Sequence, residues 1–277
     1  DEAAHMIMKR SRFVSKHNVG HTLLIAGSKG MMGAAVLAAK AALHTGAGLV
    51  SVLSAACGEK ILQTSLPEAL FIADEQDSHI SDIVLNRSYS AIAVGPGLGR
   101  HEETARAFYK LLGQIKRPIV LDADALNLLA GHTELIENLP KNSILTPHHL
   151  EFDRLFGKND TSYERLNKAR EIAIRYHIII VLKGANTAIV TPKGDVLFNS
   201  SGNAGMATAG SGDTLTGMIT GLLAQGYHPI PAAILGVFLH GTAGDLAAER
   251  DSQEYITAGD IISQIGQAYK KLHNYRV

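Results

Sequence analysis

The chain has 277 residues, of which 46% are hydrophobic and 19% are charged, with 26 basic and 26 acidic side chains and a formal net charge of zero. This length suits one large α/β domain or two small ones, and the balanced charge argues against a nucleic-acid-binding surface or an acidic tail. No apolar run reaches the roughly 18 residues of a membrane span, and no signal peptide is visible in the sequence.

The cysteine content and the first residues of the chain bear on its compartment and its start. Cys57 is the only cysteine, so no intramolecular disulfide can form, which favours a reducing compartment and a cytoplasmic location. The chain opens at Asp1 without an initiator methionine, as expected of a processed chain or a piece of a longer one. Residues 1–20 are polar and basic without clear periodicity, and we expect them to form an amino-terminal extension.

From residue 21 onward, short apolar runs alternate with longer helical patterns. The runs predict strands at 21–27, 48–54, 90–94, 118–122, 143–147 and 178–183, and a hairpin from 188–191 and 195–199. The helical patterns predict helices at 31–45, 102–113, 149–156, 162–176, 214–225, 229–249 and 257–272. This alternation is typical of sheets covered on both faces, so we predict one three-layer α/β/α domain over 1–277 with a mostly parallel central sheet.

A glycine-rich loop opens directly into a predicted helix at 203–217 (NAGMATAGSGDTLTG). Such a loop presents free backbone N–H groups and the positive end of the helix dipole, which together predict a phosphate site. Asp213 is unexpected there, because phosphates repel a carboxylate. Its expected task is to take a proton from a substrate hydroxyl. The alternative is that Asp213 only caps the helix, for which Asp is a favoured residue.

Polar or glycine-rich segments follow five of the predicted strands. They are Ser28-Lys29, Gly95–Gly99 (GPGLG), Asp122 with Asp124 and Asn127, His148 with His149 and Glu151, and Lys183–Thr187 (KGANT). In open parallel sheets, ligands bind beyond the carboxyl ends of the strands. We therefore predict that these five segments line one site.

Several of these segments carry a second interpretation. Lys183 is either a phosphate-binding cation or a solvated strand end, and Asp122 and Asp124 are either turn formers or part of the chemistry. For His148 and His149 we favour hydrogen bonding or substrate contact over metal ligation, because neighbours on an extended chain point opposite ways. The GPGLG loop lacks the GxGxxG spacing of a dinucleotide-binding fold, and the chain contains no P-loop.

Taken together, several segments resemble the NAD(P)H-hydrate dehydratases of the ribokinase-like superfamily. The resemblance rests on 26–52 (AGSKGMMGAAVLAAKAALHTGAGLVSV), 66–70 (LPEAL), 93–100 (AVGPGLGR), 120–129 (VLDADALNLL), 145–155 (LTPHHLEFDRL), 181–187 (VLKGANT) and 203–217. These enzymes repair NADH or NADPH whose nicotinamide ring has added water, and they use ATP or, in most bacterial members, ADP. The resemblance thus implies a ribokinase-like fold and an ADP- or ATP-dependent hydro-lyase.

The resemblance also implies roles for individual residues, with Asp213 matching the family's catalytic aspartate. The positions expected to contact the hydrated dinucleotide are Ala34, Gly97, His148, Glu151 and Asp213. Those expected to contact ADP or ATP are Lys183, Gly184, Ala185, Asn186, Thr187, Gly210, Ser211 and Gly212. Magnesium is the expected metal, with no ligands assigned.

Two features depart from the resemblance. Similar proteins often show His-Lys-Gly before the first strand, where this chain has Ser15-Lys16-His17-Asn18. Some relatives also carry an amino-terminal epimerase domain, which these residues do not include. The Ala-rich helices and few aromatic residues make a homo-oligomer the expected assembly, with a tetramer as one form.

Two other functions stay open at this point. One is a kinase of the same superfamily that acts on a small vitamin-precursor alcohol, such as a thiazole or pyrimidine alcohol. It would share the Gly210–Asp213 turn but would not need TPHHLEF (146–152) or room for a dinucleotide. The other is a non-catalytic adenine-nucleotide sensor, against which an intact Asp213 argues.

Overall fold

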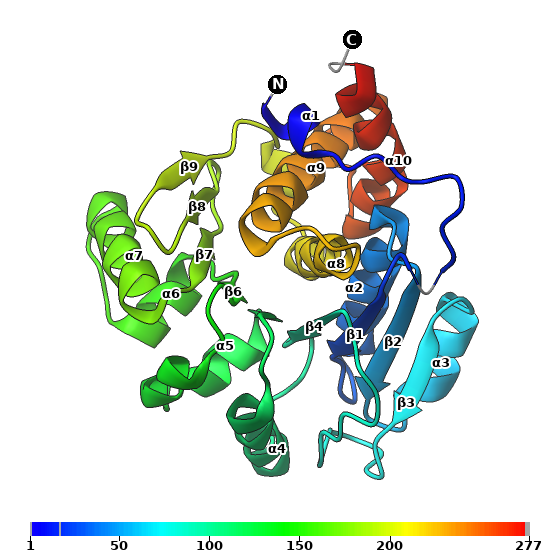
Figure 1. Cartoon of the computed structure of the whole chain (residues 1–277), viewed down its shortest axis with the longest axis vertical. Helices are drawn as coiled ribbons and strands as arrows, with labels where there is room; N and C mark the ends of the chain where they lie inside the picture. The colour runs from blue at the N-terminus through cyan, green and yellow to red at the C-terminus, as the bar shows by residue number, and fades with distance from the viewer. Residues whose placement is uncertain (1, 17, 275–277) are drawn as a thin grey trace.

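A nine-stranded sheet forms the centre of the protein (Figure 1). The computed structural model describes residues 2–16 and 18–274, so His17 of the string Ser15–Asn18 lies outside the described residues. The strand order is β3-β2-β1-β4-β5-β6-β7-β8-β9. The strands are β1 His21–Ile25, β2 Leu49–Ser54, β3 Leu70–Ala73, β4 Ala91–Val94, β5 Ile119–Leu121, β6 Ile144–Leu145, β7 Ile179–Leu182, β8 Ala188–Val190 and β9 Val196–Phe198.

In the sheet order from β3 to β7, which includes β1 and β2, every pair of neighbouring strands is parallel. The hairpin at the other edge is antiparallel, with β8 between β7 and β9. The predicted mostly parallel sheet and edge hairpin are therefore confirmed. The helices are α1 Glu2–Met6, α2 Met32–Thr45, α3 Gly58–Ser65, α4 Glu102–Gln114, α5 Asp124–Leu129, α6 His149–Phe156, α7 Ser162–Tyr176, α8 Ser211–Ala224, α9 Pro229–Arg250 and α10 Ala258–Asn274, with 3-10 turns at Thr133–Asn138 and Ala204–Met206.

Apolar side chains on both faces of the sheet hold the three layers together. In β1, Leu23 and Ile25 face a core shared with helices α4, α5, α6 and α7. Leu24, between them, faces the opposite core, which α2, α3, α8 and α9 cover. All three leucine and isoleucine side chains are buried, as expected of a strand with a helical layer on each side. Helix α10 packs outside α9 in a further apolar cluster.

Helices α2 and α8 approach each other through small residues. A Cβ atom added to Gly217 of α8 would lie 2.1 Å from the carbonyl oxygen of Ala38 in α2, and one added to Gly221 would lie 2.8 Å from that of Ala42. Such distances leave no room for a side chain at either glycine. The close packing expected of the Ala-rich helix is thus present, and it fixes the position of α8 against the sheet.

Several elements differ from those predicted from the sequence. Strand β3 is short and only half buried, so its pattern carries little apolar signal. Residues 1–20 are not wholly irregular, because α1 buries Ala3 and Ala4 against α9 and α10. Helix α8 begins at Ser211 and not at Thr214, because Gly210 caps it in a left-handed conformation with φ 86°.

Helix α9 is long and apolar enough, by length and composition alone, to cross a membrane. However, 67% of its apolar window is buried inside the protein. It lies between α8 and α10 (Figure 1), which is the position of a core helix.

Candidate active site

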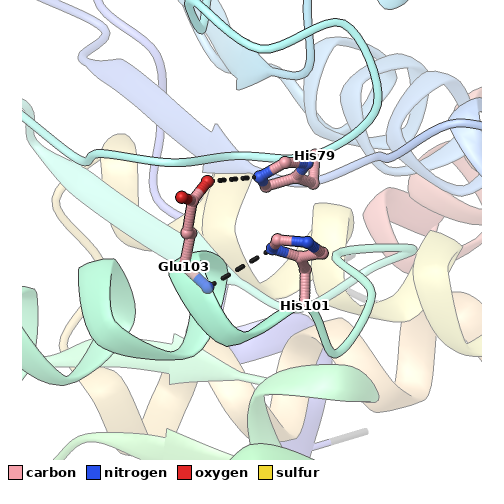
Figure 2. Close-up of side chains that lie close together, drawn as sticks. All are labelled: His79, His101 and Glu103. Atoms are coloured by element: carbon pink, nitrogen blue, oxygen red, sulfur yellow. Dashed lines mark hydrogen bonds and ion pairs between the residues drawn. The ribbon is translucent and has the colours of Figure 1, made fainter.

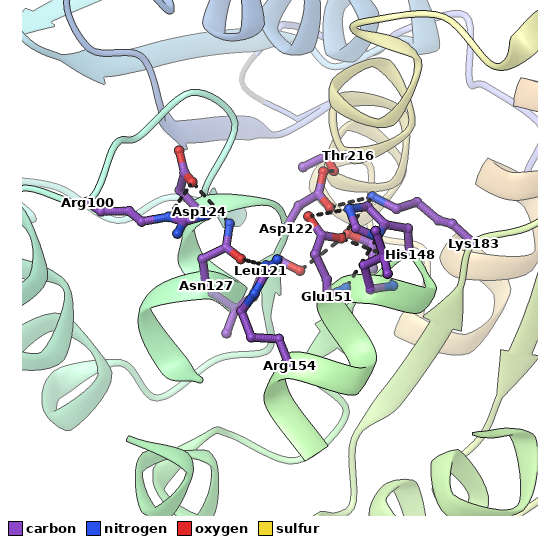
Figure 3. Close-up of polar contacts among 12 residues, drawn as sticks. Arg100, Leu121, Asp122, Asp124, Asn127, His148, Glu151, Arg154, Lys183 and Thr216 are labelled. Carbon is purple, nitrogen blue, oxygen red and sulfur yellow. Dashed lines mark hydrogen bonds and ion pairs between the residues drawn. The ribbon is translucent and has the colours of Figure 1, made fainter. Parts of the chain in front are cut away.

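The carboxyl ends of five adjacent strands meet at one edge of the sheet. Strands β1, β4, β5, β6 and β7 are neighbours in that order and run parallel. The five polar segments predicted to share a site all follow these strands, so the fold brings them to the same edge. Figure 3 shows side chains from three of these strand ends turned toward one another beside α8.

The first turn of α8 forms one wall of this edge. Gly210 is the N-cap residue, and its backbone conformation is one that L side chains rarely adopt. The Ser211 amide donates to the carbonyl of Thr208 at 3.3 Å, and amides of a first helical turn have no partner within the helix. Because the cap residue is a glycine and makes no side-chain cap, the capping alternative for Asp213 is wrong.

A lysine and two carboxylates form the centre of the site. The Lys183 Nζ donates to Asp122 Oδ1 at 2.8 Å and lies 3.8 Å from Glu151 Oε2. The other Asp122 oxygen, Oδ2, accepts from the Thr216 hydroxyl at 2.7 Å (Figure 3). The Lys183 side chain is 19% exposed and that of Asp122 only 1%. Lys183 is therefore not a solvated strand end, and Asp122 does more than form a turn.

The carboxylates decide the charge of Lys183. Burial disfavours the ammonium, but the charges of Asp122 and Glu151 more than offset it, so the pKa of Lys183 is raised. Burial also raises the pKa of Glu151, while the positive charge of Lys183 opposes that rise. Lys183 thus stays cationic at neutral pH beside the α8 turn: a Cβ atom added to Gly212 would lie 3.2 Å from its Nζ.

Asp213, the third residue of α8, is adjacent to this centre. Burial raises the pKa of its carboxyl to about 6, and the negative charge of Asp122 adds to the rise. The charge of Lys183 opposes it. A carboxyl with this pKa is largely ionised at pH 7 yet more basic than an ordinary aspartate, which suits a general base.

His148 has a hydrogen-bonding role that its sequence position left open. Its Nδ1 accepts from the amides of Leu150 and Glu151 at 3.1 and 3.2 Å, and the Glu151 carboxylate accepts from the His148 amide at 2.9 Å. This reciprocal arrangement is a capping box at the start of α6. Burial lowers the pKa of His148, helped by the charge of Lys183, so the imidazole is neutral at pH 7.

A pocket of about 770 Å³ opens beside the α8 turn. Six of the eight residues expected to contact ADP or ATP line it, namely Lys183, Gly184, Ala185, Thr187, Ser211 and Gly212. Asn186 and Gly210 do not line it. His148, expected on the dinucleotide side, does. The remaining wall comes from 199–208 and from α9, where the buried His240 reaches Ser211 Oγ at 3.3 Å.

Of the residues expected to contact the dinucleotide, His148 lines this pocket, whereas Ala34, Gly97, Glu151 and Asp213 do not. Ala34 and Gly97 are neighbours, since a Cβ atom added to Gly97 would lie 3.0 Å from the Ala34 Cβ. The Gly97 carbonyl accepts from the Ser28 hydroxyl at 2.9 Å, which joins the ends of β1 and β4. The Asp124 carboxylate accepts from the Gly99 amide at 2.9 Å. Glu151 lies under His148, in contact with Lys183.

Charged residues of both groups act on the pKa of Asp213. The charges of Asp122 and Lys183, on the pocket side, act on its pKa, and so does that of Asp124, which holds the Gly95–Gly99 loop.

Three residues of the site were missed or left undecided by the sequence analysis. The position of Asp122 directly after a buried strand indicates a possible site residue, but an aspartate that only forms a turn occurs at the same position. Thr216 and His240 lie inside helices among apolar residues and carried no signal. His240 is buried, and burial lowers its pKa to about 4, so it is neutral beside Ser211.

Comparisons with known proteins give matches of one kind. A family-level sequence profile described as NAD(P)H-hydrate dehydratase matches residues 22–267. The bifunctional NAD(P)H-hydrate repair enzyme Nnr of Moorella thermoacetica is 41% identical over 265 residues, which are 91% of this chain and 50% of that protein. The ADP-dependent (S)-NAD(P)H-hydrate dehydratase of Neisseria meningitidis is 37% identical over 286 aligned positions, covering 98% of this chain and 90% of that protein.

A solved structure shows the same likeness in three dimensions. It is the ADP/ATP-dependent NAD(P)H-hydrate dehydratase of Bacillus subtilis co-crystallised with ATP and Mg²⁺, at a TM-score of 0.87 and 34% identity, covering 98% of this chain and 96% of that one. The predicted ribokinase-like fold is thereby confirmed. This chain spans about half the length of the bifunctional relatives it matches. By profile, identity and fold, the chain belongs to the NAD(P)H-hydrate dehydratase family.

Proposed function

We propose that this protein catalyses the ADP- or ATP-dependent dehydration of the S epimer of hydrated NADH and NADPH. The observation that carries the proposal is Asp213 in the first turn of α8, where burial raises the pKa of its carboxyl to about 6 and the preceding residue, Gly212, lines the 770 Å³ pocket. The names of the Neisseria and Bacillus relatives support the same reaction.

The chemistry follows from a poor leaving group. Hydroxide leaves a saturated ring carbon slowly, and phosphorylation of the hydroxyl converts it into a good leaving group. Asp213 would accept the hydroxyl proton while the oxygen attacks the terminal phosphoryl group of the nucleotide, whose P–O bond breaks. The ring nitrogen lone pair then expels phosphate, and loss of a proton from the neighbouring ring carbon restores the dihydronicotinamide.

The chain's own residues would hold the reactants for these steps. The amides of Gly210–Asp213 and the positive end of the α8 dipole would face the phosphoryl group, and Lys183 would add a positive charge beside them. The pocket formed by Lys183–Thr187 and 199–208 would hold the adenine nucleotide. Fixing two nucleotides against each other would supply much of the rate by orientation alone.

Magnesium fits the donor set at this site. Asp122, Glu151 and Asp213 surround one lysine, which leaves an excess of carboxylate oxygens near the Gly210–Asp213 turn, here named the phosphate turn. Mg²⁺ binds through one or two carboxylates together with substrate phosphates. Glu151 is the side chain that would hold it with the phosphate oxygens. When bound, the ion would neutralise charge on the transferred group.

One assay tests the proposal directly. The protein is mixed with hydrated NADH and ADP or ATP in the presence of Mg²⁺, and the nicotinamide absorbance is followed. We expect the absorbance to return in step with phosphate release. A small-alcohol kinase would instead consume nucleotide with thiazole or pyrimidine alcohols and leave hydrated NADH unchanged, and a sensor would bind nucleotide with no turnover.

Three further features are part of the proposal. A homo-oligomer, a cytoplasmic location and a single catalytic unit over 1–277 are predictions from the sequence and the family. The sedimentation velocity of the purified chain tests the first, and activity of the chain by itself tests the last.

The raised pKa of Asp213 predicts a pH dependence. A general base works when it is deprotonated, so kcat/KM should rise with pH through about 6 and level off above it. Asp122 is one of the charges that raise this pKa, together with Asp124 and Glu151, while Lys183 lowers it. Asp122→Asn should therefore move the acid limb to lower pH. A profile that is flat between pH 5 and 8 would remove Asp213 from this role.

His148 is expected to serve the hydrated dinucleotide. We predict that His148→Ala raises the KM for that substrate about tenfold, in line with the 1–3 kcal/mol lost when a buried polar partner is removed, and changes the nucleotide KM less. His148→Asn is the matched variant, because asparagine also caps helices. Both variants should raise KM, and only the alanine should lower Tm. A larger effect on nucleotide KM would reverse the assignment of the two sides.

A further inference from the structure

A second group of ligand-type side chains lies away from the pocket, where the 74–90 connection meets α4 (Figure 2). It consists of His79, His101 and Glu103. Each offers one donor atom, and these three atoms lie within 4.8 Å of one another. Among the described residues this is the one group of three or more His, Cys, Asp or Glu side chains close enough to share a metal ion.

Both ring nitrogens of His79 have a partner that fixes the ring in place. Its Nε2 lies 2.7 Å from Glu103 Oε2, and its Nδ1 lies 3.0 Å from the Ser78 hydroxyl. A histidine ligand in metalloproteins has its second ring nitrogen hydrogen-bonded, which fixes the tautomer and the ring orientation. The His79 side chain is 12% exposed and that of Glu103 is 41%, so the protein encloses one side and water reaches the other.

His101 completes the group. Its ring stacks on that of His79 with 3.7 Å between centroids, and its Nδ1 accepts from the Glu103 amide at 3.3 Å, a long contact. Glu103 contributes a carboxylate oxygen, Oε2, which is the atom that His79 Nε2 contacts. The group therefore presents two imidazoles and one anionic oxygen.

This donor set selects the class of metal. Two imidazole nitrogens and one carboxylate are the ligands of zinc sites with an open position, and they also suit Co²⁺ and Ni²⁺. Mg²⁺ and Ca²⁺ prefer oxygen. Tetrahedral bonds of 2.0–2.1 Å place ligand atoms about 3.3 Å apart. The pair formed by His79 and Glu103 must open by about half an ångström, and the ring of His101 must turn out of its stack, both possible at an exposed helix start.

We propose that His79, His101 and Glu103 form a binding site for a zinc-class divalent cation, with water as the fourth ligand. The ion would take the place of the proton now shared by His79 and Glu103. The site is distinct from the phosphate turn, and it would join the 74–90 connection to α4. The same connection also holds the β1 end, since the Ser78 carbonyl accepts from the Lys29 amide at 2.9 Å.

Calorimetric titration of the metal-stripped, tag-free protein with Zn²⁺ tests the site, and Co²⁺ absorption reports the ligands. We expect one equivalent to bind with a visible cobalt spectrum of nitrogen and oxygen ligation, in the presence of excess Mg²⁺. Glu103→Gln and His79→Ala should each weaken binding at least tenfold. Glu103→Gln keeps the backbone amide that donates to His101 Nδ1. If one of the two variants fails to fold, the other still tests the site.

His132→Ala is the control. His132 Nδ1 lies 3.1 Å from Glu134 Oε1 in an exposed His–Glu pair, which no third such side chain joins among the described residues, so its loss should leave binding unchanged. Equal weakening by His132→Ala, competition by Mg²⁺, or unchanged affinity in Glu103→Gln and His79→Ala would each overturn the site. Because the readout is binding, the result does not depend on the dehydratase activity.

Discussion

Asp213→Asn is expected to lower kcat by about 100-fold or more while leaving the fold and nucleotide affinity near those of the wild type. The carboxamide has the shape of the carboxyl group but cannot accept the hydroxyl proton. The side chain neither caps α8 nor pairs with a cation at ion-pair distance among the described residues, so its replacement removes little stability. Steady-state kinetics with hydrated NADH and calorimetry with ADP and ATP measure the two quantities.

Asp260→Asn is the control for this variant. Asp260 is also an aspartate in the first turn of a helix, α10, where its carboxylate accepts from Thr257 and contacts Arg250. Its replacement should lower Tm slightly and leave kcat unchanged. If Asp213→Asn retained activity within a few-fold of the wild type, another group would be the base.

Gly212→Val is expected to weaken ADP and ATP binding by about tenfold to a hundredfold, more than Asp213→Asn does. Its Cβ would lie 3.2 Å from Lys183 Nζ and 3.9 Å from Asp122 Oδ2, so the branched side chain would occupy the space between the turn and the lysine. Overpacking of this kind costs about 1–3 kcal/mol. The positive φ of the turn belongs to Gly210, so the effect at Gly212 is one of volume.

Gly266→Val is the matched variant for that experiment. Gly266 is also a helical glycine, but a Cβ atom added there meets nothing within 4 Å. The two variants share the cost of a β-branched residue in a helix and differ in what the side chain meets. Unchanged nucleotide affinity in Gly212→Val, measured by calorimetry beside Gly266→Val, would mean that the phosphates bind elsewhere.

Most of the sheet could be predicted because its strands are buried on both faces. Runs such as 21–27 and 178–183 are apolar throughout, and the helices between them show a different period. Strand β3 lacked this signal because it lies at the edge, with Leu70 exposed. Helix α1 was missed because five residues are too few to show a period.

The candidate site was only partly predictable, for a physical reason. That polar segments would meet at one edge follows from parallel strands, whatever the segments are. Which atoms touch does not follow. Lys183 and Asp122 are 61 positions apart, and Asp122 and Thr216 are 94 apart. Their contacts depend on strand order and on the position of α8, neither of which a local pattern records.

His148 shows the same limit at short range. The sequence placed it after a strand, where it was free to face a ligand. In the structure, its Nδ1 accepts from two amides of α6, so His148 is the N-cap of that helix. Histidine takes this position less often than serine, threonine or aspartate. Cap residues of unusual type are hard to recognise because the preference tables favour others.

The contact between α2 and α8 has a consequence for how this protein tolerates mutation. Gly217 and Gly221 touch the backbone of Ala38 and Ala42, and Gly217 lies in the same helix as Asp213, one turn further on. Any side chain at either glycine pushes the helix outward and carries the phosphate turn with it. A genetic screen for lost turnover would therefore recover Gly217 and Gly221 beside Asp213, although neither is placed to meet a ligand. Substitutions at these two glycines are therefore excluded because the position of α8 requires that neither has a side chain.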